Sequence, residues 1–319
     1  MTTLFNKSVF ETSIMIGENI RVRLENFGKR GWTLKPYMAW GSDKPCPPRL
    51  VVNPYAGCAF QHQYCYISPP AQRQEGFREH LKDRIQKAKE LKLNNLVVMV
   101  SSSTDPFQPI EKRFKDSRFA LQQLLSNGFP ILIMTRNPQT LLEEDYLEIT
   151  NHPRLSVDVS IPSLEENNPD SVYYSPIAAH LDKTYEIMRK LSDMGKYVRV
   201  KIEPVIPSVN GVEGQTREEL DEIIKKSANA GVKGIISKTM RLNHSVPKYL
   251  YERLIDYFQE NGVNEGSTLA LSVELRRGLI QPVLDACEKY GISFCPCVDS
   301  DSIGGESCRL GSFGSHQED

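Results

Sequence analysis

Residues 154–162 read RLSVDVSIP, and residues 196–207 read KYVRVKIEPVIP. The polar positions are Ser156, Asp158 and Ser160 in the first stretch and Arg199, Lys201 and Glu203 in the second. They alternate with apolar residues, so each predicted strand has one polar and one apolar face. Strands buried on both faces are usually continuous apolar runs. A barrel with a polar lumen explains the alternation, because unpaired buried charges are costly; an edge strand with one face in solvent is the alternative.

Strands and helices alternate along the chain on both sides of these two stretches. Further strands are expected over 50–54, 95–102, 129–136, 232–240 and 292–297, and helices over 76–93, 115–128, 141–151, 175–195, 216–231, 246–262 and 274–291. Ser175 and Pro176 would begin the longest helix, and Thr216 would begin the next through a capping box. Such alternation is typical of βαβ units and a parallel sheet.

The fold class that follows is α/β: a partial (β/α)6 TIM-type barrel with N-terminal and C-terminal extensions. We expect the barrel core over residues 49–242. Residues 1–48 would be an N-terminal extension, and residues 243–319 would hold the C-terminal helices, the last strand and a cysteine-bearing tail.

Composition narrows the classes of partner. Lys and Arg number 39 and Asp and Glu 40, so the net charge is −1. A strong nucleic-acid binder usually carries a basic excess, so nucleic acid is not favoured as a partner. No apolar run reaches the roughly 18 residues of a membrane helix, and the first 20 residues lack the pattern of a signal peptide. We therefore expect a cytoplasmic protein with no membrane partner.

Five of the cysteines gather at two places in the sequence. There are seven, and an odd number in a reducing compartment argues against a disulfide framework. Cys58, His62 and Cys65 form a C-x3-H-x2-C loop directly after the first strand, where barrel active sites lie. Such close spacing lets three side chains converge on one metal centre. Cys295, Cys297 and Cys308 form a candidate second metal set; ordinary packing at a strand end is the alternative.

The first cysteine loop, within NPYAGCAFQHQYCYISPP (53–70), resembles the C-x3-C-x2-C loop of radical SAM enzymes, which use S-adenosylmethionine (SAM). Its NPY-x-GC and YCY elements are similar to the form found in the spore photoproduct lyase-like branch. The segment SSSTDPFQPIEKRFKDSR (101–118) resembles that branch's TDPYQP-x-E motif. Residues 130–137 and 200–211 also lie where the branch expects them. The resemblance extends over about residues 49–242.

This resemblance implies the cofactors and the chemistry. In the family, three cysteines hold three irons of a [4Fe–4S] cluster, and SAM binds the fourth iron. An electron from the cluster cleaves SAM, and the resulting 5′-deoxyadenosyl radical removes a hydrogen atom from the substrate. The partners would be SAM, an unknown substrate and an external low-potential electron donor. By position, Cys58, His62 and Cys65 would be the cluster ligands. Residues near SAM would be Tyr64, Tyr66, Ser103, Thr104, Asp105, Arg136, Ser160, Lys201 and Glu203.

His62 departs from the family pattern, which has a cysteine at this position. Histidine can ligate iron, as in Rieske centres, but it is neutral, so it raises the reduction potential of the cluster. Three interpretations remain open. His62 is a ligand of an unusual cluster, or it marks a degenerate site that binds a cluster weakly or not at all. Alternatively, another residue supplies the third ligand and His62 acts as an acid or base.

Several functions are consistent with these residues. The first is a radical SAM enzyme whose reaction class (lyase, oxidoreductase or transferase) is open. The second is a catalytically degenerate or redox iron–sulfur protein on the same fold. A DNA photoproduct lyase-like repair enzyme is less favoured, because those lyases use a cysteine near the second-strand motif and SSSTD contains none. The last is a structural domain that binds zinc through Cys58, His62 and Cys65.

Overall fold

The computed structural model describes residue 20 and residues 22–28, 33–37, 47–67 and 70–306. Its main sheet has eight strands in the order β1-β2-β5-β6-β7-β8-β9-β13. They are β1 (Lys35–Tyr37), β2 (Arg49–Val52), β5 (Val98–Val100), β6 (Ile131–Thr135), β7 (Leu155–Ser160), β8 (Tyr197–Val205), β9 (Gly234–Thr239) and β13 (Ser293–Cys295). All neighbours pair in parallel except β1 and β2, which are antiparallel.

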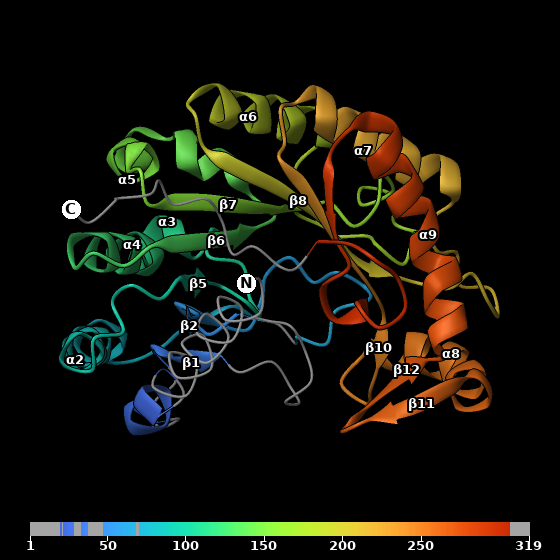
Figure 1. Ribbon diagram of the computed structural model, residues 1–319, viewed down its shortest axis with the longest axis horizontal. Helices are drawn as coiled ribbons and strands as arrows, with labels where there is room; N and C mark the ends of the chain where they lie inside the picture. The colour runs from blue at the N-terminus through green and yellow to red at the C-terminus, as the bar shows by residue number, and fades with distance from the viewer. Residues whose placement is uncertain (1–19, 21, 29–32, 38–46, 68–69, 307–319) are drawn as a thin grey trace, which may run out of the picture.

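The strand order identifies the sheet as barrel-like. From β2 onward every strand pairs with the next main-sheet strand along the chain, whereas a doubly wound sheet reverses direction. Helices follow the outer side of the curved sheet (Figure 1). The edge strands β1 and β13 do not pair with each other in the described chain, so the barrel is open. The expected partial TIM-type barrel is confirmed.

The helices largely match their predicted positions. They are α2 (Phe77–Glu90), α3 (Glu111–Phe114), α4 (Asp116–Ser126), α5 (Leu147–Asn151), α6 (Leu181–Asp193), α7 (Arg217–Asn229), α8 (Lys248–Asn261) and α9 (Val273–Tyr290), with 3-10 turns η1 (Pro138–Leu142), η2 (Glu144–Tyr146) and η3 (Cys297–Asp299). Thr216 caps α7 as predicted, because its Oγ1 accepts the Glu219 amide at 3.1 Å. The reciprocal half of the capping box is not formed, since the Glu219 carboxylate accepts hydrogen bonds from Ser163 and the Leu164 amide instead. The predicted start at Ser175 is wrong, because α6 begins at Leu181.

The main core lies between the sheet and its outer helices. Val157, Val200 and Ile235 are buried on the outer faces of three neighbouring strands, as the alternation predicts for Val157 and Val200. Each fully buried side chain of this kind contributes about 1.5–3 kcal/mol relative to exposure. Because helices cover the outer faces, the polar faces of β7 and β8 turn inward, and neither strand is an edge. The predicted polar lumen is therefore confirmed.

A smaller unit is inserted between β9 and α9. It is an antiparallel sheet of β10 (Arg241–Leu242), β12 (Thr268–Leu271) and β11 (Gly262–Glu265), together with α8. Leu250, Leu254 and Phe258 of α8 are fully buried in a second apolar cluster, which Tyr173 and Ile206 of the barrel also join. These three strands are not anticipated by the sequence analysis. In the part of the chain that the structure describes, no helix is long and apolar enough to cross a membrane.

Candidate active site

The cysteine loop follows a short strand, β3 (Tyr55–Ala56), which pairs with β4 (Gln72–Arg73). Gly57 adopts φ 65°, a left-handed conformation that glycine accommodates without strain. Gln108 fixes the turn from the neighbouring β5–α3 loop. Its Oε1 accepts the Ala59 amide at 2.8 Å, and its Nε2 donates to the Gly57 carbonyl at 3.2 Å. The loop is thus held at the carboxyl ends of β2 and β5.

Glu111, the last residue of the TDPFQPIE segment, also helps to hold the start of the cysteine loop against the β5–α3 loop. Glu111 is 3% exposed and accepts hydrogen bonds from the hydroxyls of Tyr55 and Tyr146. It also accepts the amides of Ser117 and Arg118 at 2.9 and 3.0 Å. The sequence analysis quoted this motif without assigning roles to Gln108 or Glu111. Their structural role is to attach the cysteine loop to the second βα unit.

Three predicted SAM-site residues lie in the same β5–α3 loop. Asp105 is buried, and its carboxylate accepts the amides of Phe107 and Arg136 at 2.8 and 2.5 Å and the Thr135 hydroxyl at 3.1 Å. Burial raises the pKa of Asp105 to about 6, against the lowering effect of these bonds. Thr104 donates to the Tyr55 carbonyl at 3.2 Å, and the Ser103 amide donates to Asn53 at 3.3 Å. These contacts connect the ends of β2, β5 and β6.

His62 lies in a buried aromatic and ionic cluster. Its ring stacks on Phe60 and Tyr64, with centroids 6.0 and 5.2 Å away. Its Nε2 is 3.5 Å from Oε1 of Glu166, and the same oxygen accepts Arg136 Nε at 2.7 Å. Burial and then the Arg136 charge lower the pKa of His62 to about 3, so the imidazole is neutral. Sequence reasoning anticipated His62 and Arg136 but missed Glu166.

The β7–α6 loop delivers Glu166 to this position. Ser175 Oγ donates to the Phe60 carbonyl at 2.5 Å, and the Gln63 amide donates to the Tyr174 carbonyl at 3.2 Å. The Ser175 amide donates to the backbone oxygen of Glu166 at 3.0 Å. Ser175 therefore does not cap α6, because its hydroxyl holds the cysteine loop instead. The cysteine loop is gripped from both sides, by the loops that follow β5 and β7.

Two groups of charges line the lumen. Asp158 and Arg199 are opposite each other on β7 and β8 and form a bidentate ion pair at 2.8 and 3.0 Å. Farther along β8, Glu203 Oε2 lies 3.0 Å from Lys201 Nζ and 3.5 Å from Lys238 Nζ. Burial would raise the pKa of Glu203, but the two lysines outweigh it and the net pKa is low. One carboxylate thus faces two ammonium groups.

The remaining predicted SAM-site residues are Tyr64, Tyr66 and Ser160. The Tyr64 ring contacts His62 and lies 5.7 Å from the ring of Tyr173. Tyr66 is 50% exposed and lies close enough to raise the pKa of Lys238, together with Glu203 and Cys297. Ser160 ends β7 opposite Lys201. The cysteine loop and the charged lumen therefore meet near Lys238.

Of the C-terminal cysteines, Cys295 and Cys297 lie at the end of the last strand. Cys295 ends β13 and is buried, whereas Cys297 begins η3 and raises the pKa of both Lys201 and Lys238. The Asp299 carboxylate anchors η3, because Arg276 and Arg241 contact it at 3.0 and 2.6 Å. Cys308 lies outside the described residues. Cys297 therefore lies within electrostatic reach of the lumen lysines, and the second metal set remains a prediction.

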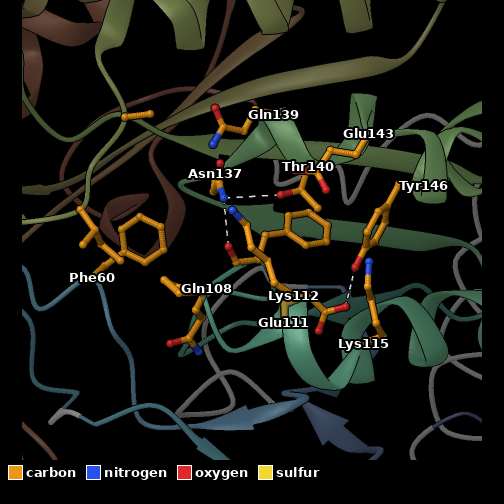
Figure 2. Close-up of a pocket in the computed structure, with 14 residues that line it drawn as sticks. Phe60, Gln108, Glu111, Lys112, Lys115, Asn137, Gln139, Thr140, Glu143 and Tyr146 are labelled. Atoms are coloured by element: carbon orange, nitrogen blue, oxygen red, sulfur yellow. Dashed lines mark hydrogen bonds between the residues drawn. The ribbon is translucent and has the colours of Figure 1, made fainter.

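A cavity of about 180 Å³ adjoins the cysteine loop at Phe60. Phe60 lines it together with amide and hydroxyl groups from the β6–η1 turn (Figure 2). Asn137 Nδ2 donates to the Phe107 carbonyl at 3.0 Å and to Thr140 Oγ1 at 3.4 Å. Asn137 Oδ1 is buried without a hydrogen-bond partner among the described residues. The cavity therefore has a polar wall on the side of the β6–η1 turn.

The donor set fits an iron–sulfur cluster in kind. Cys58 and Cys65 are thiols outside any disulfide, and burial raises the pKa of both, that of Cys58 to about 11. His62 is neutral, which is the state a metal ligand needs. No three His, Cys, Asp or Glu side chains of the described chain are close enough to hold a single ion. Cluster ligands lie farther apart, because each binds a different iron.

Two proteins are similar to this chain in sequence. The radical SAM Nα-GlyT isomerase of Pseudomonas phage M6 is 22% identical over 269 residues, which covers 74% of this chain and 53% of the isomerase. An uncharacterized protein of Methanocaldococcus jannaschii is 26% identical over 180 residues, covering 53% of this chain and 66% of that protein. The chain thus spans about half to two thirds of these relatives. No family model matches it.

Solved structures share the fold. Streptococcus suis SuiB bound to SAM has a TM-score of 0.53 at 13% identity, over 80% of this chain and 52% of SuiB. A variant of spore photoproduct lyase has a TM-score of 0.57 at 14% identity, over 81% of this chain and 79% of the lyase. The sequence match is thus to a radical SAM enzyme, and the chain shares the fold of SuiB and of spore photoproduct lyase, in agreement with the resemblance of the cysteine loop.

Proposed function

We propose, from its place in the radical SAM superfamily, that this chain is an enzyme that holds a [4Fe–4S] cluster on Cys58, His62 and Cys65 and binds SAM beside it. When bound, the cluster supplies an electron to SAM, whose cleavage provides the radical that takes a hydrogen atom from the substrate. The observation that carries the proposal is the cysteine loop itself. It is gripped by Gln108 and Ser175 at the carboxyl ends of the strands and adjoins a charged lumen.

The residues around the loop have separate tasks in this proposal. Phe60 and Tyr64 stack on His62 and exclude water from that side of the cluster. Lys201 and Lys238 attract the carboxylate of an incoming ligand, because Glu203 balances only one of their two charges. The SAM-facing roles of Tyr66, Ser103, Thr104, Asp105, Arg136 and Ser160 belong to the same proposal.

The substrate and the electron donor are left open in this proposal. The isomerase and SuiB are distant relatives, and this chain spans about half of each. An external low-potential donor would reduce the cluster. The odd number of cysteines is consistent with a reducing compartment such as the cytoplasm.

Anaerobic reconstitution with iron and sulfide tests the function. We expect a brown protein that forms 5′-deoxyadenosine from SAM with dithionite as reductant. A Cys58→Ala/Cys65→Ala variant should lose both properties, whereas Cys287→Ala, which alters a buried cysteine of α9, should keep them. His62→Cys should raise the iron content and make the cluster easier to assemble. A brown protein that leaves SAM intact would favour the redox alternative, and a colourless protein with stoichiometric zinc would exclude the proposal.

A further inference from the structure

Glu166 is a fully buried carboxylate whose position has no explanation in the packing of its own loop. Its side chain is 0% exposed, and an isolated carboxylate in such a place is costly. Its contacts are to Arg136, which is 3% exposed, and to Nε2 of His62. Both partners come from other parts of the chain, the end of β6 and the cysteine loop. Glu166 therefore connects a candidate cluster ligand to a buried cation.

Hydrogen bonding in this cluster is incomplete. Nε2 of His62 and Nη1 of Arg136 are buried without a hydrogen-bond partner among the described residues. Buried polar atoms almost always find a partner. Oε1 of Glu166 lies 3.5 Å from Nε2, so a small adjustment on cofactor binding would complete a hydrogen bond between them.

We propose that Glu166 is the positioning carboxylate of His62: it accepts a hydrogen bond from Nε2–H, and His62 ligates the cluster through Nδ1. This inference rests on the proposed function, because it assigns His62 as a ligand. Histidines that ligate metals commonly donate their other ring N–H to a carboxylate, which fixes the tautomer and raises ligand basicity. Stacking on Phe60 and Tyr64 fixes the plane of the ring, so its two nitrogens cannot exchange places easily.

The pair has a consequence for redox chemistry. Exchanging a thiolate for a neutral imidazole removes one negative charge from the ligand set, which raises the reduction potential. A carboxylate that accepts a hydrogen bond from Nε2–H makes the imidazole more electron-rich. It therefore restores part of the negative charge that the ligand set loses when a histidine replaces a cysteine. Arg136 partly offsets this effect, because it contacts the same carboxylate. Glu166 thus keeps the cluster more strongly reducing than a histidine alone would allow.

The experiment is a double-variant cycle on the reconstituted full-length protein. The variants are Glu166→Gln, His62→Cys and the two combined, and the measurement is the midpoint potential of the cluster by EPR-monitored titration. Glu166→Gln should shift the reduction equilibrium at least tenfold toward the reduced cluster in the native background, which is 59 mV for one electron. In the His62→Cys background the same change should shift it less than threefold, because no Nε2–H remains.

A matched control separates this contact from a general loss of buried charge. Asp158→Asn removes another buried carboxylate of the lumen that is paired with an arginine, Arg199, and does not contact His62. It should shift the reduction equilibrium less than threefold. Pulsed EPR should detect a directly coordinated histidine nitrogen in the native protein and in Glu166→Gln. If Glu166→Gln does not fold, Glu166→Asp, which keeps the charge but withdraws it by one methylene, should shift the potential in the same direction.

Each outcome decides a separate point. Equal shifts in the two backgrounds, or no shift in either, would overturn the role of Glu166 while leaving the proposed function intact. A cluster that shows no histidine nitrogen would also overturn it. A native protein that takes up no cluster would overturn both, and the zinc and iron contents would show this before any potential is measured.

Discussion

The two halves of the barrel lining differ in chemistry although both are made of parallel strands. β2, β5 and β6 turn Val51, Met99 and Leu132 inward, and these three form an apolar cluster of their own. β7, β8 and β9 instead present charged side chains, among them Asp158 and Arg199. The change occurs between two neighbouring strands, since Leu132 lies opposite Ser156 and Met134 opposite Asp158.

The two halves of the lining therefore have different roles at the candidate site. The cysteine loop follows β2 and β3, so the candidate cluster site lies at the end of the apolar half. Charges on the other half can orient a polar ligand without adding like charge beside the thiols. Gly234 shows how closely the charged half is packed: a Cβ there would lie 3.7 Å from Cδ of Arg199 and 2.6 Å from the Ser293 hydroxyl.

The largest expected effect on the free energy of unfolding comes from removing one partner of the ion pair in the charged half. Asp158→Ala leaves the buried guanidinium of Arg199 without the carboxylate that balances it, so unfolding should become about 3–5 kcal/mol easier. Urea denaturation of the protein without cofactors measures this. Asp158→Leu combined with Arg199→Met removes both charges and should unfold within about 1 kcal/mol of the native protein, or be more stable. A double variant as unstable as the single one would mean that the pair is needed for folding.

A smaller effect is expected in the apolar half. Leu132 is 1% exposed, and Leu132→Ala should cost about 3 kcal/mol through lost burial and the cavity left behind. Leu132→Met keeps the volume and should cost less than about 1.5 kcal/mol. Both values come from the same denaturation experiment. A cost below about 1 kcal/mol for Leu132→Ala would contradict a dry lining on this side.

The alternation in β7 and β8 was enough to predict the polar lumen, because strand side chains point to opposite faces in any parallel barrel. The loops could not be predicted in this way. Residues 175–180 begin with a Ser-Pro pair that is typical of a helix start, but the hydroxyl of Ser175 bonds to Phe60 and α6 begins only at Leu181. The role of Glu166 could not be predicted for the same reason, because its side chain contacts residues that are 30 or more positions away in the sequence. The strands of the inserted sheet are two to four residues long, too short for a periodic signal.

The smallest expected effect concerns the excess positive charge of the lumen. The side chain of Lys238 is 38% exposed and shares Glu203 with Lys201, so Lys238→Met should change the free energy of unfolding by less than about 1 kcal/mol. Under the proposed function, SAM binding to the reconstituted protein should nevertheless weaken about tenfold, or about 1.4 kcal/mol, because its carboxylate loses a cation.

Equilibrium dialysis with SAM and with decarboxylated SAM identifies which group Lys238 contacts. The weakening should appear with SAM and be absent with the decarboxylated compound, which has no carboxylate to bind. Lys248→Met, at an 87% exposed position of α8, is the matched control and should leave both affinities unchanged. If Lys238→Met weakened both ligands equally, the lysine would act on the cluster or on the loop. The charged half of the lining would then serve to hold the site together, and the division of work between the two halves would not stand.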